Sequence, residues 1–229
     1  MYQRDYLMRM IEQFSMTLGQ VLFKRRNQQF AEAMELLTQA MKQLLGLNSK
    51  LVLALSVKDL MALLTTQGQF DAGKGLLLSD MLKAEGDLLV DAAEEDEGMA
   101  CHMKSLELLL EMRWMQEASE LEQEMEERIE DFLTIIKPGI MPLRVLKPLV
   151  HYYDSTGRLA KAEDMLFFIL DADVDPTVWI DSGLHMVERW QKMSTDELAQ
   201  GELNAEEVRE TYTQLVKMKQ KASKIERMQ

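Results

Sequence analysis

Residues 68–77 read Gly-Gln-Phe-Asp-Ala-Gly-Lys-Gly-Leu-Leu, and residues 157–166 read Gly-Arg-Leu-Ala-Lys-Ala-Glu-Asp-Met-Leu. Each stretch has a turn glycine, an apolar residue two places later, a small residue five places later and a large apolar residue eight places later. Glycine ends helices readily because it adopts the left-handed conformation without strain. The small residue lets two helix backbones approach closely. The pattern therefore predicts two helices joined by a short turn.

The same pattern recurs five times along the chain. Its turn positions are Gln28, Gly68, Arg113, Gly157 and Gly201, at successive spacings of 40, 45, 44 and 44 residues. The fifth copy is irregular, because Ala205 comes one place early. A near-constant period of this kind is typical of stacked helical hairpins. We expect an all-α fold of stacked antiparallel helical hairpins, an α-solenoid of about ten helices with an irregular period of about 40–45 residues.

The composition also favours helix over sheet. The 229 residues include only 4 Pro and 11 Gly, and aromatic residues make up 7%. Helix-forming residues are abundant, and the chain contains no alternating apolar pattern that would indicate paired strands. No run of about 18 apolar residues occurs, so we expect no transmembrane helix.

A single helical-repeat domain is expected over residues 1–229. Lys137-Pro138-Gly139 is a strong helix stop, and Pro142 suits the start of the next helix. The stop predicts a bend near residues 137–142, between N-terminal hairpins (1–136) and C-terminal hairpins (142–229).

Local signals place further helix boundaries. The acidic run at 94–98 is interpreted as a loop or a frayed helix end, with helices expected at 49–67, 99–112 and 115–136. Predicted helix starts carry capping residues, namely Asp71, Asp175 with Pro176, Ser194 with Glu197, and Asn204 with Glu207.

The charge of the chain excludes some classes of partner. The net charge is −13 and the pI is about 4.8, which disfavours binding to nucleic acid or to an anionic membrane. The N-terminus lacks the basic start and apolar core of a signal peptide. A single cysteine, Cys101, fits a reducing compartment. We expect a cytoplasmic protein that has no nucleic-acid or membrane partner.

Two family resemblances can be read from particular residues. Tyr153, Gly157, Ala162 and Leu166 stand at the offsets of a tetratricopeptide repeat, which the chain resembles over about one fifth of its length. The period of 40–45 departs from the 34 residues of that family, which implies longer helices or larger loops. The opening Arg4-Asp5-Tyr6, with residues 11–13, also resembles the start of an uncharacterised bacterial family, a domain of unknown function. This second resemblance implies a bacterial cytoplasmic protein and supplies no activity.

The sequence offers little chemistry. Three histidines occur, and no zinc motif or cysteine pair accompanies them. The Gly-Lys-Gly at 73–75 lacks the spacing of a phosphate loop, and Cys101 next to His102 does not form a dyad on a helix. We therefore expect no catalytic site, no cofactor and no metal site. One enzymatic alternative stays open, a pocket that collects His151, Tyr153 and Asp154.

Two non-catalytic interpretations remain. The first is a scaffold or adaptor that binds a protein or peptide on the first helices of its hairpins, with candidate residues Gln20, Lys24, His151 and Tyr153. The second is a self-assembling structural or regulatory protein. Residues 80–131 hold 18 acidic and 4 basic residues, whereas residues 215–229 hold 5 basic and 1 acidic. Pairing of these two segments between copies would form a homo-oligomer.

Overall fold

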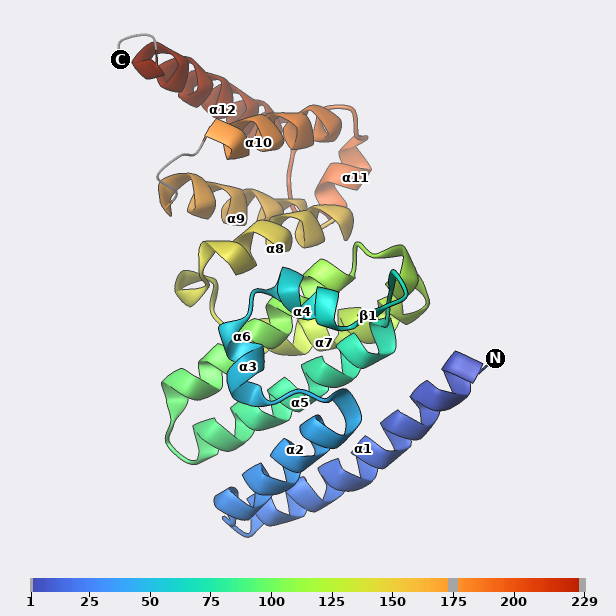
Figure 1. Cartoon of the computed structure of the whole chain (residues 1–229). Helices are drawn as coiled ribbons and strands as arrows, with labels where there is room; N and C mark the ends of the chain where they lie inside the picture. Colours follow the sequence, from blue (N-terminus) through green and yellow to red (C-terminus); the bar gives the residue numbers. More distant parts are fainter. Residues whose placement is uncertain (1, 173–176, 227–229) are drawn as a thin grey trace. The chain divides into compact units, whose positions relative to one another are not determined.

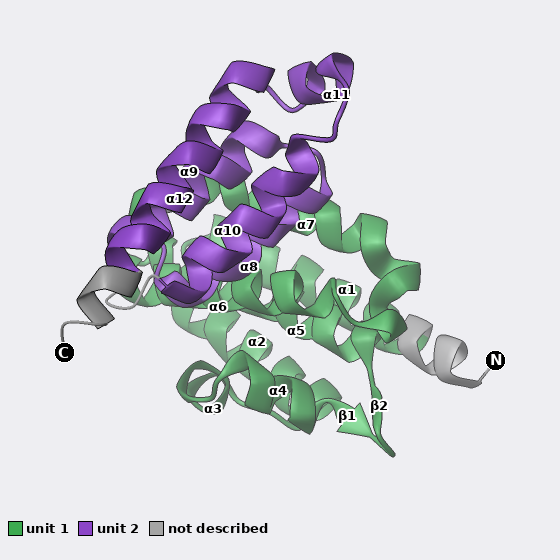
Figure 2. Ribbon diagram, turned by 90° about the horizontal axis from the view of Figure 1, so that it is seen from above, with its two compact units in different colours: residues 1–140 green, residues 141–229 purple. Residues whose placement is uncertain are grey.

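The computed structural model describes residues 2–172 and 177–226. Helix accounts for 82% of the chain, which confirms the all-α prediction. Figure 1 shows the helices in chain order, and Figure 2 shows the two compact units into which the chain divides, residues 1–140 and residues 141–229. The single domain over 1–229 and the bend expected near 137–142 stay predictions.

Unit 1 contains seven α-helices among its described residues. They are α1 (Tyr2–Arg26), α2 (Phe30–Leu45), α3 (Ser49–Ala54), α4 (Val57–Leu63), α5 (Ala72–Asp91), α6 (Glu95–Met112) and α7 (Glu122–Ile135). Two short strands, β1 (Thr65–Thr66) and β2 (Gln69–Phe70), and two 3-10 helices, η1 (Gln116–Leu121) and η2 (Pro138–Ile140), complete it.

Unit 2 contains five α-helices among its described residues. They are α8 (Leu143–Ser155), α9 (Leu159–Ala172), α10 (Thr177–Trp190), α11 (Thr195–Gln200) and α12 (Ala205–Glu226). Helix α8 packs on α9, and α10 packs on both α9 and α12. Tyr152 and Trp190 are fully buried in this core. None of the helices described in either unit is long and apolar enough to cross a membrane.

The core of unit 1 is the pair formed by α5 and α6. Helix α5 also packs on α1 and α2, so it is apolar on most of its circumference. Leu78, Met81 and Leu82 of α5 and Leu106 and Leu109 of α6 are all fully buried. Ala93, whose φ is +65°, forms the left-handed turn between the two helices. The repeat pattern did not find this turn, because the residue two places later is Glu95 and not an apolar residue.

Two of the five predicted turns join two helices through a left-handed residue, as expected. Gln28, between α1 and α2, has a φ of +58°, and Gly157, between α8 and α9, has a φ of +74°. The small residues that follow, Ala33 and Ala162, are completely buried. The sequence pattern therefore locates these two helical hairpins correctly.

The tetratricopeptide resemblance rests on residues of the second of these hairpins. Tyr153, Ala162 and Leu166 are all buried where α8 and α9 pack together. The resemblance itself stays a prediction.

The turn at Gly201 is not left-handed. Gly201 has a φ of −82°, and the next residue, Glu202, takes a positive φ of +63° instead. Glycine is needed here for a different reason, since an added Cβ would lie 2.5 Å from Leu159 Cγ and 2.9 Å from the carbonyl oxygen of Gly157. The backbones of two turns meet at this point.

The prediction of one helix over residues 49–67 is wrong. Helices α3 and α4 divide this segment, and β1 and β2 follow as an antiparallel hairpin in which Thr65 pairs with Phe70. Gln67 and Gly68 both have positive φ, at +53° and +78°. Two consecutive residues of this kind form the turn that joins two strands. The expectation that no strands pair is therefore also wrong, for these four residues.

The third predicted hairpin also differs. Arg113 has right-handed helical angles, and η1 precedes α7, which begins at Glu122 rather than at 115. The acidic run at 94–98 lies largely within the first turns of α6, which begins at Glu95. Acidic side chains suit this position because they interact favourably with the positive end of the helix dipole.

Most of the predicted helix caps are present. The Asp71 side chain accepts a hydrogen bond from the backbone amide of Lys74. Ser194 and Glu197 form a reciprocal capping box. Asn204 likewise accepts from the amide of Glu207, whose carboxylate accepts from the amide of Asn204. Residues 175 and 176 lie outside the described residues.

Candidate functional site

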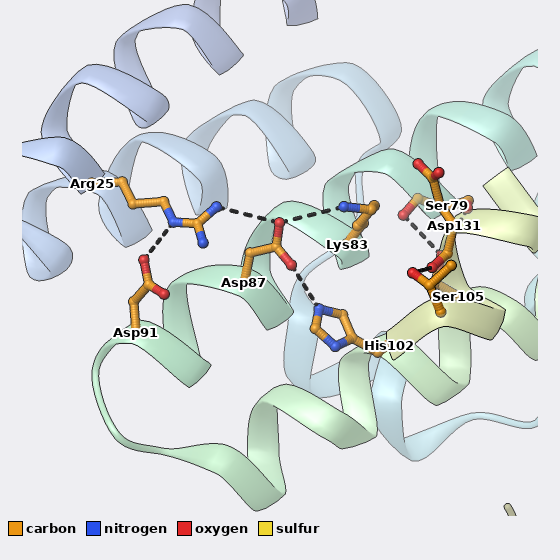
Figure 3. Close-up of polar contacts among 9 residues, drawn as sticks. Arg25, Ser79, Lys83, Asp87, Asp91, His102, Ser105 and Asp131 are labelled. Carbon is orange, nitrogen blue, oxygen red and sulfur yellow. Dashed lines mark hydrogen bonds and ion pairs between the residues drawn. The ribbon is translucent and has the colours of Figure 1, made fainter. Parts of the chain in front are cut away.

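A polar network fixes helix α1 to the central pair of helices in unit 1 (Figure 3). Arg25, in the last turn of α1, donates to Asp91 at 2.6 Å and to Asp87 at 3.3 Å, both on α5. Asp87 also lies 3.0 Å from Nε2 of His102 on α6 and 3.5 Å from Lys83. Three helices therefore meet at the Asp87 carboxylate.

The His102 ring is almost completely buried and needs the space that a glycine provides. A Cβ on Gly86 would lie 2.4 Å from Cδ2 of His102 and 2.8 Å from the carbonyl oxygen of Gly98. His102 also packs on the ring of Phe132, with 5.9 Å between the ring centroids. Its Nδ1 atom has no hydrogen-bond partner among the described residues. This environment indicates that the ring has a structural role.

The pKa of the Asp87 carboxyl is lowered. Burial by itself would raise this pKa, but the hydrogen bond from His102 and the charges of Lys83 and Arg25 outweigh burial. The carboxylate is therefore ionised at neutral pH, where it holds α1, α5 and α6 together.

The buried polar residues of α5 and α6 also support packing. Glu85 accepts a hydrogen bond from Ser49 at the start of α3, and Lys104 donates to the carbonyl of Leu55 at the end of α3. Burial, reinforced by the charge of Glu85, raises the pKa of Cys101 to about 12. Cys101 is therefore a thiol at neutral pH and is a poor nucleophile.

An open groove of about 880 Å³ lies between α5 and α7 in unit 1. Arg128 of α7 binds Asp80 of α5 through two hydrogen bonds, at 2.6 and 2.9 Å. The lining of the groove has more carboxylates than cations. It comprises Asp80, Lys83, Gln123, Glu126, Glu127, Arg128, Glu130 and Asp131. The groove is thus polar and carries negative charge.

Helix α1 presents apolar residues on two sides. Met10, Phe14 and Val21 are buried against the neighbouring helices α2 and α5. On the other side are exposed residues that we call the outward face of α1, namely Ile11, Met16, Gly19, Leu22 and Phe23. Met16 and Phe23 are 68% and 64% exposed. A helix that is apolar on two sides is usually covered on both, so the outward face is a candidate binding site.

A family model matches residues 1–220, and its description is a family of unknown function, DUF6483. The chain belongs to this family. The match agrees with the resemblance of the first residues to an uncharacterised family. No curated protein and no solved structure was found to match the chain.

Two of the predicted binding residues of this DUF6483 member lie on α1. Gln20 is exposed, and Lys24 forms an ion pair with Glu32 of α2. On a helical wheel Lys24 lies toward α2, away from the outward face. Lys24 therefore takes part in packing within the α1–α2 hairpin.

The other two predicted residues lie on α8 in unit 2. Tyr153 is buried, with the guanidinium of Arg158 4.7 Å from its ring centroid. His151 is exposed, and its ring centroid lies 5.9 Å from that of Trp179 on α10. Tyr153 thus contributes to the core of unit 2, and His151 to the contact between α8 and α10.

The residues of the enzymatic alternative have separate contacts. The Asp154 carboxylate accepts hydrogen bonds from Trp190 at 2.9 Å and from Arg189 at 2.5 Å, both near the end of α10. His151 contacts Trp179 at the beginning of α10. The carboxylate is therefore engaged in packing, and the enzymatic alternative stays a prediction. Over residues 2–172 and 177–226, no group of three or more His, Cys, Asp or Glu could hold a metal ion.

Sequence reasoning missed the outward face of α1. The available signal was that this helix has more apolar residues than one helical stripe can hold, for example Met16 and Phe23. The inward stripe of Met10, Phe14 and Val21 accounts for the packing on α2 and α5. The remaining apolar residues of α1 needed a second explanation.

Proposed function

We propose that this protein is a non-catalytic scaffold or adaptor that binds other proteins in the bacterial cytoplasm. The observation that carries the proposal is the outward face of α1. Met16 and Phe23 are more than half exposed there, on a helix whose opposite side is already buried. Exposed apolar side chains gathered on one helix face are typical of protein-binding surfaces.

The surroundings of the polar groups support a non-catalytic role. The Asp87, His102 and Arg25 side chains are bound to one another across three helices. The Asp154 carboxylate is bound to two residues of α10. In each case the polar group stabilises helix packing.

The proposal is tested by capturing proteins from the lysate of the source cell on the tagged full-length chain. Three baits are compared at low and at high salt: the wild type, a Met16→Ser/Phe23→Ser variant, and a Phe168→Ser control. Phe168 is also an exposed phenylalanine, but it lies on α9 in unit 2. Thermal melts establish that all three baits are folded.

We expect the wild type and the Phe168→Ser control to retain the same protein at high salt, and the α1 variant to lose it. Apolar contacts persist as salt rises, whereas contacts between exposed charges weaken. The captured protein is either another protein or an untagged copy of this chain. Equal capture by all three baits, or capture of nothing by the wild type, would contradict the proposal.

Electrostatic self-association is a second candidate, favoured by the acidic groove of unit 1. Lys217 and Lys221 of α12 are exposed, whereas Lys219 pairs with Asp181 of α10 at 2.7 Å. Association of these lysines with the groove of another copy would weaken steeply as salt rises. A Lys217→Glu/Lys221→Glu variant would abolish such association and would leave capture through α1 unchanged.

A further inference from the structure

The outward face of α1 has a charge pattern in addition to its apolar residues. Glu12, Gly19 and Arg26 are seven residues apart, which places them along one line on the surface of a helix, with a drift of about 20° for each step. This line runs along the middle of the outward face. Ile11 and Leu22 lie on one side of it, and Met16 and Phe23 lie on the other.

Glu12 and Arg26 are both exposed, and neither forms an ion pair or hydrogen bond with another described residue. Other charged side chains in the last turns of α1 are paired, since Lys24 binds Glu32 and Arg25 binds Asp91. The two unpaired charges therefore stand at the two ends of the outward face. They have opposite signs and lie at equal distances from Gly19.

Gly19 marks the middle of this line. A Cβ at this position would meet no atom within 4 Å, so the fold of unit 1 does not require glycine here. Glycine inside a helix costs about 1 kcal/mol relative to alanine. A glycine on an exposed face allows the backbone of a second helix to approach closely, which gives a physical reason for its presence.

We propose that the outward face of α1 binds the same face of a second copy of this chain, with the two α1 helices antiparallel and crossing at Gly19. The inference rests on the proposed function, because it names the partner of the same surface. A two-fold axis at Gly19 brings Glu12 of each copy against Arg26 of the other. The axis also brings Met16 of each copy against Phe23 of the other. A methionine sulfur next to an aromatic ring is a favourable contact.

The antiparallel direction follows from the charges. In a parallel pair, Glu12 would face Glu12 and Arg26 would face Arg26, and like charges at such positions are destabilising. The antiparallel pair instead contains two attractive contacts. Two crossing helices bury less surface than the roughly 800 Å² per partner of a standard interface, so the dimer is expected to be weak and concentration-dependent.

The inference is tested by sedimentation equilibrium of the full-length chain over a range of concentrations. Two charge-reversal variants are compared with the wild type, Glu12→Arg and Arg26→Glu, first separately and then in an equimolar mixture. Each variant alone replaces two attractive contacts by two repulsive ones. We expect its dimer dissociation constant to rise about tenfold.

The mixture restores attraction in a dimer with one copy of each variant. The arginine introduced at position 12 then faces the glutamate introduced at position 26, and the unchanged Arg26 of the first copy faces the unchanged Glu12 of the second. We expect the mixed dimer to form about as tightly as the wild-type dimer. A structural role of Glu12 or Arg26 within one copy would not produce this recovery. Thermal melts of each variant establish that the fold of the single chain is unchanged.

A wild type that is monomeric at all concentrations would overturn the inference, as would a mixture that associates no better than its two components. Failure of the proposed function is a separate result. If the wild type is monomeric but the Met16→Ser/Phe23→Ser variant loses a different captured protein, the adaptor proposal survives and the second copy is the wrong partner. If that variant captures everything that the wild type captures, and the wild type is also monomeric at all concentrations, both proposals fail.

Discussion

Nε2 of His102 lies 3.0 Å from Oδ1 of Asp87, in a contact that joins α6 to α5 beneath the last turn of α1. The same carboxylate binds Arg25 of α1 and Lys83 of α5. One ionised group thus links three helices of unit 1. Its removal leaves His102 buried and Arg25 without one of its two partners.

We expect the Asp87→Asn substitution to destabilise unit 1 by about 1–3 kcal/mol at pH 7, because hydrogen bonds to charged groups are replaced by weaker ones. The pKa of Asp87 is lowered in the folded protein, so its stabilisation is present above the unfolded pKa, about 4, and is lost as pH falls through the folded pKa. The difference between wild type and variant should therefore narrow below about pH 4. Urea unfolding at pH 7 and at pH 3 measures both effects. If wild type and variant differ in unfolding free energy by the same amount at both pH values, the charge of Asp87 does not contribute to stability.

Alanine substitutions at two glycines inside helices, Gly86 and Gly19, should change the stability of the protein in opposite directions. Gly86→Ala should destabilise the protein by about 1–3 kcal/mol, since the new Cβ would overlap His102 and the backbone of Gly98. Gly19→Ala should stabilise a single chain by about 1 kcal/mol, because alanine favours helix and the space is open. Circular-dichroism melts of dilute protein measure both changes. Equal shifts in the same direction would contradict the packing described around His102.

Two turn residues of unit 2, Gly157 and Glu202, have positive φ, so substitutions at them should change stability in opposite directions. Gly157→Val should destabilise the α8–α9 hairpin by about 1–2 kcal/mol, because valine is strained at a φ of +74°. Glu202→Gly should stabilise the protein by about 1 kcal/mol, because Glu202 already has a φ of +63°. Both changes are measured by thermal melts. If Glu202→Gly instead destabilises the protein, the contacts of the Glu202 side chain contribute more to stability than the backbone strain costs.

Cys101 is expected to react with thiol reagents only after unfolding. Its side chain is fully buried, and burial together with the charge of Glu85 raises the pKa of the thiol to about 12. The reactive thiolate is therefore scarce at pH 8. Ellman's reagent should modify the protein slowly in buffer and rapidly in concentrated urea. Fast modification in buffer would show that α5 and α6 separate readily.

Sequence reasoning succeeded where a local signal determines local structure. Gly157 and the Ser194 capping box need only a few neighbouring residues, and both have the predicted conformation. The reasoning failed where packing between helices, rather than the local sequence, determines the backbone conformation. Ala93 forms a left-handed turn without glycine, because the close packing of α5 on α6 fixes the turn between them.

Less of the candidate site than of the fold could be predicted from the sequence. Tyr153, which was predicted to bind a partner, is buried in the core of unit 2, and its part in binding stays a prediction. The apolar residues of the outward face of α1 could be distinguished from those that pack within unit 1 only after the buried side of this helix was known. The charge of Asp87 and the ring of His102 lie fifteen residues apart in sequence, so no local pattern signals their contact.

The central claim, that α1 pairs with α1 of a second copy, is tested most directly by hydrogen–deuterium exchange of the wild-type chain at low and high protein concentration. Pairing stabilises the associated state by mass action and therefore slows local opening of the helix that is covered. We predict that exchange over residues 11–26 slows as concentration rises, while exchange over α8 and α9 stays the same. Exchange over residues 11–26 that is independent of concentration would contradict the claim.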